Sequence, residues 1–536
     1  MKNGPFPYYE VEYFYTFLEM LEKVKSKYQD KILFRTKKKQ GEQIITYEQF
    51  YDDVLRLSSF FITESQKKRQ KIAVIGEDSY EWILTYLAVC VSGNIIVPLD
   101  KELSVSDISE QLNDCECKTI VNSASYDDIV DELREKEQDI RSISMRDLRS
   151  LIEKETALSY AEPDPDAMTA IIYTSGTTGK SKGVMLSQRN ICADVCHCCE
   201  NIRFVGRTIA MLPFHHTFAM LVTVLMGVYS GVETLICPSM KNLMSMMQEF
   251  KPTYLNVVPA IIESIDRSIT SQIENSGKKN ILAIADKLCK ICEAIGLNNV
   301  RKRIFKKIRE SFGGEIDYFI SGGAPIDQKI IDRFETYGIR ILNGYGISEC
   351  SPVVSVNRRY YVKAGSVGQP MHHIEVRIDQ PDEDGEGEIC VNSDVVMLGY
   401  YNNPEETAAV LKDGWFHTGD KGRIDNDGFI YITGRIKNLI ILSNGKNVSP
   451  EELEILIGRI SGVEEVLVCE KNNQIVAEIY PSESVRNQGV NLHDIFMEQI
   501  DRLNEALPPY KNIADIIITD TAFEKTTTKK IKRKYQ

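Results

Sequence analysis

A loop rich in glycine, hydroxyl and lysine side chains separates two apolar runs, and this arrangement restricts the possible folds most strongly. The apolar run from Met168 to Tyr173 predicts a buried strand, and Val184 to Leu186 resume the apolar pattern. The segment between them reads Tyr173-Thr174-Ser175-Gly176-Thr177-Thr178-Gly179-Lys180-Ser181-Lys182-Gly183. Its glycines let backbone N–H groups approach an anion closely, and its hydroxyl and ammonium groups add donors. The sequence therefore predicts a polyphosphate-binding loop between two ordered elements.

This loop is not the common P-loop. That motif needs a glycine five positions before the glycine of Gly-Lys-Ser. In this chain Gly179-Lys180-Ser181 would require glycine at position 174, where Thr174 stands. A different class of nucleotide-binding protein is therefore indicated.

Short strands alternate with helices through the first part of the chain. Lys71 to Gly76 and Asn94 to Pro98 read as strands, with a helix from Tyr80 to Val91 between them. The same alternation recurs from Thr119 to Leu133 and from Tyr254 to Asp266, so a parallel sheet is expected. Before it, the pattern predicts a helix, a hairpin and a second helix, at Tyr8 to Lys27, Ile32 to Thr46 and Tyr47 to Ile62.

The segment from Lys278 to Phe312 is helical and basic. Val300, Ile304, Phe305, Ile308 and Phe312 form one apolar face, and lysine and arginine cover the others. Such a helix either lies on an anionic membrane surface or packs on its own domain with a solvated outer face. Both alternatives stay open at the level of sequence.

The sequence pattern changes after Gly385, where predicted strands separated by turn glycines dominate, and it changes again near Ile436. Two strands, Val463 to Cys469 and Gln474 to Tyr480, then lie among helices. We therefore predict a large N-terminal domain, residues 1–435, and a small α+β domain, residues 436–536, which is within the usual range of domain size.

Composition excludes several classes of protein. The formal net charge of −13 argues against a nucleic-acid partner. The 13 cysteines show no framework spacing, which favours reduced thiols and a cytoplasmic location. The N-terminus shows no signal-peptide core, and the apolar stretch from Ala219 to Cys237 is too punctuated for a membrane span. Cys196-His197-Cys198-Cys199 lacks the spacing of a zinc site.

Two motifs combine small residues with chemically active ones. Asn343-Gly344-Tyr345-Gly346-Ile347-Ser348-Glu349 follows a predicted strand. The glycines expose the ring of Tyr345 for stacking on a base, Ser348 can donate to a phosphate, and Glu349 offers the oxygen ligand that Mg²⁺ prefers. Ser321-Gly322-Gly323-Ala324-Pro325 also ends a strand, and its small side chains let a flat ring approach the backbone.

Further motifs follow towards the C-terminus. Trp415-Phe416-His417-Thr418-Gly419-Asp420 places a carboxylate after a tight turn, and a carboxylate can accept hydrogen bonds from ribose hydroxyls. Next come Gly434-Arg435-Ile436-Lys437-Asn438 and Ser443-Asn444-Gly445-Lys446-Asn447-Val448-Ser449-Pro450. The chain ends near Phe523-Glu524-Lys525-Thr526-Thr527-Thr528-Lys529-Lys530-Ile531-Lys532-Arg533.

Together and in this order, these motifs resemble those of the adenylate-forming superfamily, and in particular bacterial long-chain fatty acid–CoA ligases. The resemblance covers about residues 10 to 536. It implies an α/β fold with parallel and mixed sheets flanked by helices, a β-rich subdomain and a mobile C-terminal α+β domain. It also implies ATP, Mg²⁺ and coenzyme A as cofactors and co-substrates.

The resemblance implies roles for individual residues. Thr174, Lys182 and the rest of the loop would bind phosphates, and Glu349 with Thr174 would bind Mg²⁺. The segment Gly323-Ala324-Pro325 would wall the adenine, and Gly323 and Gly346 would also border the acid. Asp420 and Arg435 would contact the ribose and phosphate side, and Lys437 would be the pivot of the small domain. Gly445 and Lys446 would approach the acyl-phosphate and thiol.

The same resemblance puts Lys530 at the catalytic lysine of the C-terminal loop. Two residues depart from the family pattern, since Glu524 stands in place of proline and Lys529 in place of glycine. Lys529 stiffens the loop, and its charge depresses the pKa of the neighbouring lysine. A histidine of Pro213-Phe214-His215-His216 would border the acyl pocket, His216 before His215; a core histidine is the alternative.

The predicted reaction is ATP-dependent activation of a fatty acid to acyl-AMP, followed by transfer to coenzyme A. Between Ile209 and Val232 no acidic residue is available to pair with the ammonium of an amino acid, and the segment suits an alkyl chain. Other carboxylic acids, an acyl carrier protein as acceptor, or a catalytically lapsed nucleotide-binding protein remain alternatives.

Overall fold

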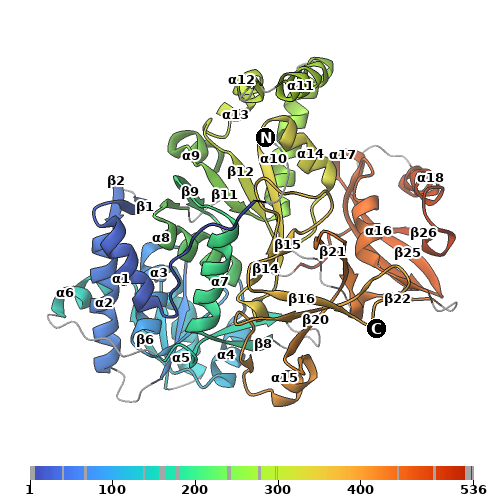
Figure 1. The fold of residues 1–536 in the computed structure, drawn as a ribbon. Helices are drawn as coiled ribbons and strands as arrows, with labels where there is room; N and C mark the ends of the chain where they lie inside the picture. The colour runs from blue at the N-terminus through green and yellow to red at the C-terminus, as the bar shows by residue number, and fades with distance from the viewer. Residues whose placement is uncertain are drawn as a thin grey trace. The chain divides into compact units, whose positions relative to one another are not determined.

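The structure is a computed structural model, and it describes residues 6–38, 41–64, 69–136, 139–155, 164–175, 181–237, 243–275, 279–295, 297, 300–442, 446–486, 491–525, 531 and 533. The chain divides into two compact units (Figure 1). Unit 1 comprises Met1–Glu375 and Val391–Phe416, and unit 2 comprises Val376–Cys390 and His417–Gln536. Among the described residues, none of the helices combines the length and hydropathy that crossing a bilayer requires.

A seven-stranded sheet in the order β18-β8-β7-β4-β3-β5-β6 carries the predicted phosphate loop. Strands β3 to β7 run parallel to their neighbours, whereas β8 and β18 are antiparallel additions at one edge. The strands are β3 (Lys71–Ile75), β4 (Ile95–Pro98), β5 (Thr119–Asn122), β6 (Arg141–Ser144), β7 (Met168–Ser175), β8 (Ser181–Ser187) and β18 (Gly399–Tyr400). This sheet confirms the parallel pairing predicted for the first part of the chain.

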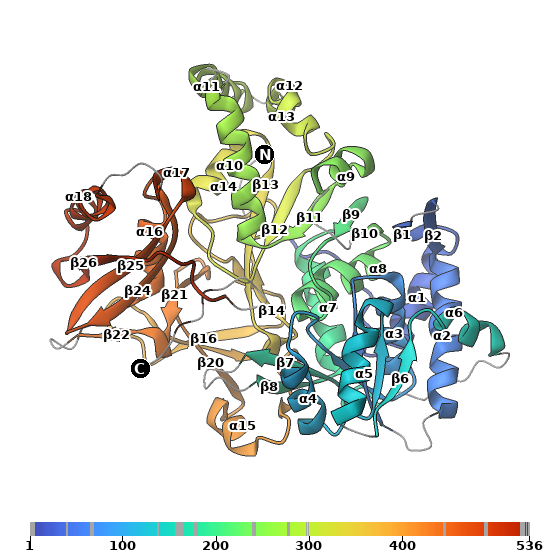
Figure 2. The same cartoon turned by 180° about the vertical axis from the view of Figure 1, so that it is seen from behind.

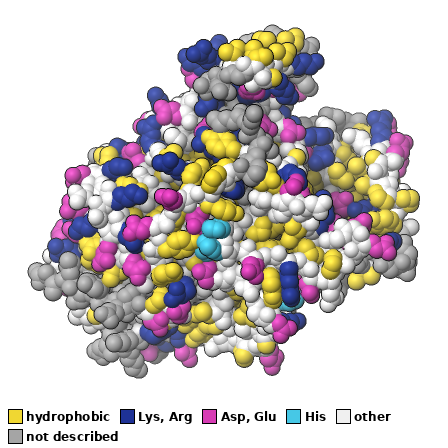
Figure 3. Space-filling model, viewed as in Figure 1, with side chains coloured by type: hydrophobic (Ala, Val, Ile, Leu, Met, Phe, Trp, Pro, Cys, Tyr) yellow, Lys and Arg dark blue, Asp and Glu magenta, His cyan; other side chains and the backbone are white. Residues whose placement is uncertain are grey.

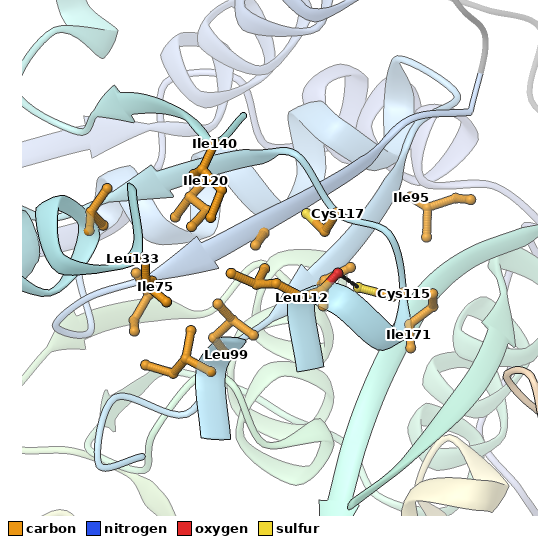
Figure 4. Close-up of a cluster of buried hydrophobic side chains, with 14 residues drawn as sticks. Ile75, Ile95, Leu99, Leu112, Cys115, Cys117, Ile120, Leu133, Ile140 and Ile171 are labelled. Atoms are coloured by element: carbon orange, nitrogen blue, oxygen red, sulfur yellow. Dashed lines mark hydrogen bonds between the residues drawn. The ribbon is translucent and has the colours of Figure 1, made fainter. Parts of the chain in front are cut away.

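Helices cover both faces of this sheet, which explains why its strands read as continuous apolar runs. In the cluster of Figure 4, Ile75 and Ile120 of the sheet pack with Leu112 of α4 and Leu133 of α5, all of them at most 1% exposed. Each such side chain contributes roughly 1.5–3 kcal/mol when fully buried. The helices of this part of the chain are α1 (Phe17–Tyr28), α2 (Tyr47–Glu64), α3 (Tyr80–Val91), α4 (Val105–Asp114), α5 (Asp127–Lys136), α6 (Leu148–Lys154) and α7 (Gln188–Asn201). Of these, α3 packs on β3 and β4, and α7 packs on β8, whereas α1 and α2 pack on α3. Figure 2 shows α4 and α5 in front of the sheet.

Two more sheets belong to unit 1, in the orders β2-β1-β10-β9 and β11-β12-β13-β14-β15. The first contains the predicted hairpin of β1 and β2, and in the second β11, β12 and β13 are parallel. The strands are β1 (Ile32–Lys38), β2 (Gly41–Thr46), β9 (Arg207–Ala210), β10 (Glu233–Ile236), β11 (Tyr254–Val257), β12 (Tyr318–Ser321), β13 (Arg340–Gly346), β14 (Val353–Val356) and β15 (Gln369–Pro370). Parallel strands end at a common edge, so motifs that follow them are brought together.

The remaining helices of unit 1 show where the helical patterns were misread. The first helix begins at Phe17 and not at Tyr8, because Thr16 caps it by accepting from the N–H of Glu19. The predicted helix over 278–312 is wrong as one element: it is divided into α11 (Lys279–Ala294), α12 (Val300–Ile304) and α13 (Lys306–Glu310). The others are α8 (Met226–Ser230), α9 (Leu243–Phe250), α10 (Pro259–Asn275), α14 (Gln328–Thr336) and α15 (Pro404–Val410).

Unit 2 is built around two sheets. One contains most of β16 (Glu375–Asp379), β17 (Gly387–Asn392) and β20 (Trp415–Ile424), and all of β21 (Ile430–Arg435). The short strand β19 (Leu411–Lys412), which pairs with the first residues of β20, belongs to unit 1. The other contains β24 (Val463–Lys471), β25 (Gln474–Pro481) and β26 (Ile513–Ile518), against which α16 (Pro450–Ile457) and α18 (Leu492–Asn504) bury Leu453 and Phe496. The smaller elements are α17 (Glu483–Arg486), β22 (Ile440–Ile441) and β23 (Asn447–Val448).

Unit 2 is larger than the segment predicted to form the C-terminal domain. It contains residues 376–390 and 417–435 in addition to 436–536. The predicted boundary next to Lys437 marks the start of the segment expected to move as a C-terminal domain. This boundary stays a prediction.

Candidate nucleotide and acid site

The predicted phosphate loop connects two paired strands. Thr174 lies near the end of β7 and Lys182 near the start of β8, and the two residues face each other across the antiparallel pair. The Thr174 hydroxyl donates to the Lys182 carbonyl over 3.5 Å. Residues 176–180 lie outside the described residues, as does the side chain of Ser175. The strands thus bring the first and last donors of the loop to the same end of the sheet.

Two buried acceptors lie side by side where the pairing of β12 with β13 ends. Ser321 and Asn343 are paired in register across these parallel strands. The Ser321 Oγ and the Asn343 Oδ1 are both buried and have no hydrogen-bond partner among the described residues. A buried acceptor without a partner costs about 1–3 kcal/mol, so this edge is suited to a ligand with N–H donors. Gly323, Ala324 and Pro325 follow Ser321 directly.

Strand β13 runs through most of the tyrosine motif, so Asn343 to Gly346 form a strand end instead of a loop. Gly344 and Tyr345 pair with Val356 and Ser355 of β14. At Gly346 an added Cβ would lie 2.1 Å from the carbonyl oxygen of Pro352, so only glycine fits there. Close packing of the backbone at Gly346 therefore fixes the position of the turn that carries Ser348 and Glu349.

Ser348 and Glu349 lie in a 3₁₀ turn after β13, and neighbouring segments hold both. The hydroxyls of Ser348 and Thr217 are 3.1 Å apart. The Tyr400 hydroxyl donates to Glu349 Oε1 over 2.9 Å. Burial and the Glu349 carboxylate raise the pKa of Tyr400 above its ordinary value, so this hydroxyl stays a donor.

Lys182 lies beside Tyr400, which also contacts Glu349. Its ammonium is 2.6 Å from Glu406 Oε2 and 5.2 Å from the centre of the Tyr400 ring. The Lys182 side chain is 15% exposed, and that of Glu406 is 39% exposed. Tyr400 therefore contacts both the predicted metal ligand and the predicted phosphate-binding lysine.

The segment predicted to border the acid lies against these motifs. Phe218 packs on Gly322, where an added Cβ would come within 3.2 Å of its ring. The π-helix Ala219–Leu225 follows, and all seven of its residues are buried. His215 Nε2 lies 3.4 Å from Asp100 Oδ1 with the His215 side chain 9% exposed, and the rings of His215 and His216 are 4.0 Å apart. His215 Nε2 is nevertheless buried without a hydrogen-bond partner among the described residues, so the choice between His216 and His215 stays a prediction.

In unit 2, the two residues predicted to contact ribose and phosphate are cross-strand partners. Asp420 on β20 pairs with Arg435 at the end of β21, and Arg435 Nε lies 2.8 Å from Asp420 Oδ1. Glu388 Oε1 accepts from the N–H of Gly419, whose φ of +70° is favourable for glycine. The turn before Asp420 is therefore held from β17.

The hinge and C-terminal motifs are described only in part. Lys437 lies in a 3₁₀ turn directly after β21, and Lys446 is exposed before β23. Gly445, Lys529 and Lys530 lie outside the described residues. Their predicted roles stay predictions.

Sequence reasoning missed Thr217, Tyr400 and Glu406, each of which contacts a predicted site residue. No motif marks them, because they reach the site from segments distant in sequence. The Gly399-Tyr400 pair could have marked Tyr400 as a site residue, because Tyr345 of the tyrosine motif also follows a glycine.

The motifs predicted to bind a nucleotide lie where parallel strands end, and comparison with known proteins gives the class of protein that carries them. The AMP-binding enzyme family matches residues 21–401, and the AMP-binding enzyme C-terminal domain matches residues 437–535. The chain belongs to the AMP-binding enzyme family.

Particular relatives narrow this class. The long-chain-fatty-acid–CoA ligase FadD15 of Mycobacterium bovis is 30% identical over 418 residues, which cover 72% of this chain and 68% of the relative. The long-chain-fatty-acid–CoA ligase 5 of Rattus norvegicus is 28% identical over 470 residues, covering 79% and 68%. Among solved structures, ATP-bound MatB from Rhodopseudomonas palustris has a TM-score of 0.77 at 22% identity, covering 96% of this chain and 97% of MatB, and supports the fold.

Proposed function

We propose that this protein is an ATP-dependent ligase that activates a long-chain fatty acid and transfers it to coenzyme A. The observation that carries the proposal is the convergence of Lys182, Ser348 and Glu349 through Tyr400 and Thr217. In the first half-reaction a carboxylate oxygen attacks the α-phosphorus of ATP, the bond to the β-phosphate oxygen breaks, and pyrophosphate leaves. In the second, the thiol loses its proton and attacks the acyl carbonyl, and AMP leaves.

The nucleotide fits the edge formed by β12 and β13. The exocyclic amine of adenine is an N–H donor, which the buried acceptors of Ser321 and Asn343 require. In unit 2, the resemblance of the Thr418-Gly419-Asp420 motif to that of the family suggests that Asp420 would accept from ribose hydroxyls and that Arg435, its ion-pair partner, would offer charge to the phosphate side.

Glu349 and Thr174 offer oxygen atoms only, which is the donor set that Mg²⁺ prefers. The ion, when bound, would supply positive charge to the phosphates. Lys182 and the loop over residues 176–180 would add N–H donors, and such preorganised donors stabilise the charge that develops at phosphorus. Tyr400 orients the Glu349 carboxylate, and Thr217 orients the Ser348 hydroxyl.

The apolar wall formed by Phe218 and the π-helix favours an alkyl chain over a charged or amino acid substrate. The named relatives above act on long-chain fatty acids, which supports the same choice here. Coenzyme A is the proposed acceptor, and an acyl carrier protein is the alternative that experiment can separate.

The test is pyrophosphate release with ATP, Mg²⁺ and a series of carboxylic acids, followed by thioester formation with coenzyme A or a carrier protein. We expect pyrophosphate release to be strongest with long-chain fatty acids and thioester formation to require coenzyme A. Release with an aryl or amino acid alone would overturn the substrate class. Binding of ATP without pyrophosphate release from any acid would indicate a lapsed nucleotide-binding protein.

We also infer that the tip formed by α11 and α12 contacts an anionic membrane surface. Ile284, Leu288, Ile291 and Ile295 recur at helical spacing and are 51–71% exposed. The neighbouring helix α12, which contacts α11, and the start of α13 carry exposed basic side chains at Lys302, Arg303 and Lys306. Lys302 and Lys306 also lie 3.4 Å and 3.6 Å from Asp317 and Glu310. Figure 3 shows these hydrophobic and basic colours gathered over α11 and α12. An apolar stripe with basic neighbours suits the interface of an anionic bilayer.

Co-sedimentation with vesicles tests this contact. Binding should be stronger to phosphatidylglycerol-containing vesicles than to phosphatidylcholine vesicles, and the double variant Ile284→Ser with Ile291→Ser should lose it. Ile495→Ser, which alters an exposed isoleucine on α18, is the control and should bind normally. Equal binding by all three proteins would remove the membrane contact.

A further inference from the structure

Three of the seven histidines of the chain gather with two carboxylates in unit 1, and the proposed reaction uses none of them. Glu200 lies near the C-terminal end of α7, and His372 and His373 follow β15. The His372 Nδ1 is 2.9 Å and the His373 Nε2 is 3.9 Å from Glu200 Oε2. The three potential ligand atoms all lie within 4.8 Å of one another.

These distances match the size of a tetrahedral metal site. A zinc ion binds imidazole nitrogen and carboxylate oxygen at about 2.0–2.2 Å, which places ligand atoms roughly 3.4 Å apart. The two distances from Glu200 Oε2 lie on either side of this value. Two imidazoles with one carboxylate select zinc-like transition metals over Mg²⁺ and Ca²⁺, which prefer oxygen ligands.

The backbone of the turn places two adjacent imidazoles beside the same carboxylate. His373 has a φ of +66°, in the left-handed region that few residues other than glycine adopt. The His372 and His373 rings are 3.8 Å apart. An extended backbone would instead send neighbouring side chains to opposite sides.

A second layer of polar side chains supports Glu200. His197 lies three residues earlier on α7, with its Nδ1 3.2 Å from the Tyr13 hydroxyl and its Nε2 3.0 Å from Asp394 Oδ1. Glu200 is only 7% exposed and His197 only 1% exposed. A buried carboxylate is costly unless it is paired, and three imidazoles face this one. Carboxylate–histidine pairs of this kind orient the ligands of metal sites.

We propose that Glu200, His372 and His373 form a binding site for a zinc-like divalent transition metal. His197 and Asp394 are positioning residues for it. The side chains of His372 and His373 are 38% and 52% exposed, so water can complete the coordination. Figure 3 shows histidine side chains exposed on the face where Figure 1 draws α7. Metal at this site would connect α7 to the turn after β15.

A second group of potential ligands, Glu388, Cys390 and His417 in unit 2, provides the matched comparison. There a single nitrogen, His417 Nδ1, lies 2.8 Å from Glu388 and 3.4 Å from the Cys390 sulfur. Glu388 is already engaged by the N–H of Gly419. Burial and Glu388 raise the pKa of the Cys390 thiol to about 11, which disfavours the thiolate that metals bind. This group therefore has a structural role, because Glu388 holds the turn before Asp420.

The experiment uses the full-length protein without an affinity tag, treated with chelator and titrated with Zn²⁺ by calorimetry. We expect one tight site per chain. The double variant His372→Ala with His373→Asn should weaken it about 100-fold or abolish it, and Asp394→Asn should weaken it about 10- to 100-fold. Cys390→Ala and His493→Ala, which alters an exposed histidine of unit 2, should bind Zn²⁺ as the wild type does.

Two further readouts separate metal binding from simple loss of structure. Zn²⁺ should raise the Tm of the wild type and not that of the double variant, and both metal-free proteins should unfold in one cooperative transition, which shows that the variant is folded. Co²⁺ should give visible ligand-field bands without the near-ultraviolet charge-transfer band of a thiolate ligand. Absence of a tight site, unchanged affinity in the double variant, or loss of the site in Cys390→Ala would each overturn the proposal.

Discussion

The hydroxyl of Tyr400 donates a hydrogen bond to Glu349 Oε1 over 2.9 Å, and the ring of the same tyrosine lies beside the Lys182 ammonium. One side chain therefore links the predicted metal ligand to the predicted phosphate-binding lysine. Because burial keeps the Tyr400 hydroxyl protonated, it acts as a donor that orients the carboxylate. Tyr400 is thus a positioning residue of the proposed reaction.

Tyr400→Phe should raise the Mg²⁺ concentration needed for half-maximal pyrophosphate release about tenfold. A hydrogen bond to a charged group contributes about 1.5–3 kcal/mol, and its loss lets the Glu349 carboxylate rotate. The rate at saturating Mg²⁺ should fall much less. Tyr401→Phe, at the adjacent position, is the control and should leave the Mg²⁺ dependence unchanged. A reduced rate at saturating Mg²⁺ with unchanged Mg²⁺ dependence would contradict the positioning role.

Glu349→Gln should keep the fold and lose most Mg²⁺-dependent adenylation. The amide oxygen can still accept from Tyr400, but it lacks the charge that a magnesium ligand supplies. Pyrophosphate release over a range of MgATP concentrations is the measurement, with the circular dichroism spectrum as the check on folding. Near wild-type release at saturating MgATP would remove Glu349 from the metal site.

Lys182 and Glu406 should give opposite effects although they form one ion pair. Lys182→Ala removes a donor to the phosphates, and single donors of this kind are worth about 10²–10³ in rate. Glu406→Gln removes a partly exposed competitor for the ammonium, and such pairs are worth roughly 0.2–1 kcal/mol, so ATP should bind up to about fivefold more tightly. Calorimetric ATP binding decides this; weaker binding by Glu406→Gln would show that the pair helps to build the site.

Residues adjacent in sequence were predicted better than residues adjacent only in space. The strand before the phosphate loop and the parallel pairing of β3 with β4 follow from local patterns and were confirmed. Tyr400 and Glu406 reach Glu349 and Lys182 from 51 and 224 positions away, and no local pattern encodes such contacts.

Tertiary packing also overrode the helical pattern between α11 and α13. Arg309 was assigned to the solvated side, yet it is 3% exposed, because its guanidinium donates to the carbonyl oxygens of Gly338 and Ile316. Ile304, on the predicted apolar face, is 40% exposed. The partners that bury Arg309 are backbone groups more than one helical turn away in sequence, which periodicity cannot detect.

The two half-reactions should separate in variants of Lys530 and Lys437. Lys530→Ala should abolish acyl-AMP formation and leave thioester formation from supplied acyl-AMP largely intact, if its ammonium acts on phosphorus alone. Lys437→Pro should do the reverse if Lys437 is the predicted pivot, because a proline in the 3₁₀ turn after β21 fixes φ and would block the predicted rotation of the C-terminal domain. The rates of the two half-reactions, measured separately on each variant, are the readout.

Lys529→Ala is the matched control for this last prediction, since it removes the neighbouring lysine. It should leave both half-reactions close to wild type, because the proposed contact with phosphate belongs to Lys530. If Lys529→Ala and not Lys530→Ala abolishes adenylation, the alignment of the C-terminal motif is shifted by one residue. If neither variant changes either half-reaction, the C-terminal lysines are solvated and the proposed reaction lacks the catalytic lysine that the resemblance implies.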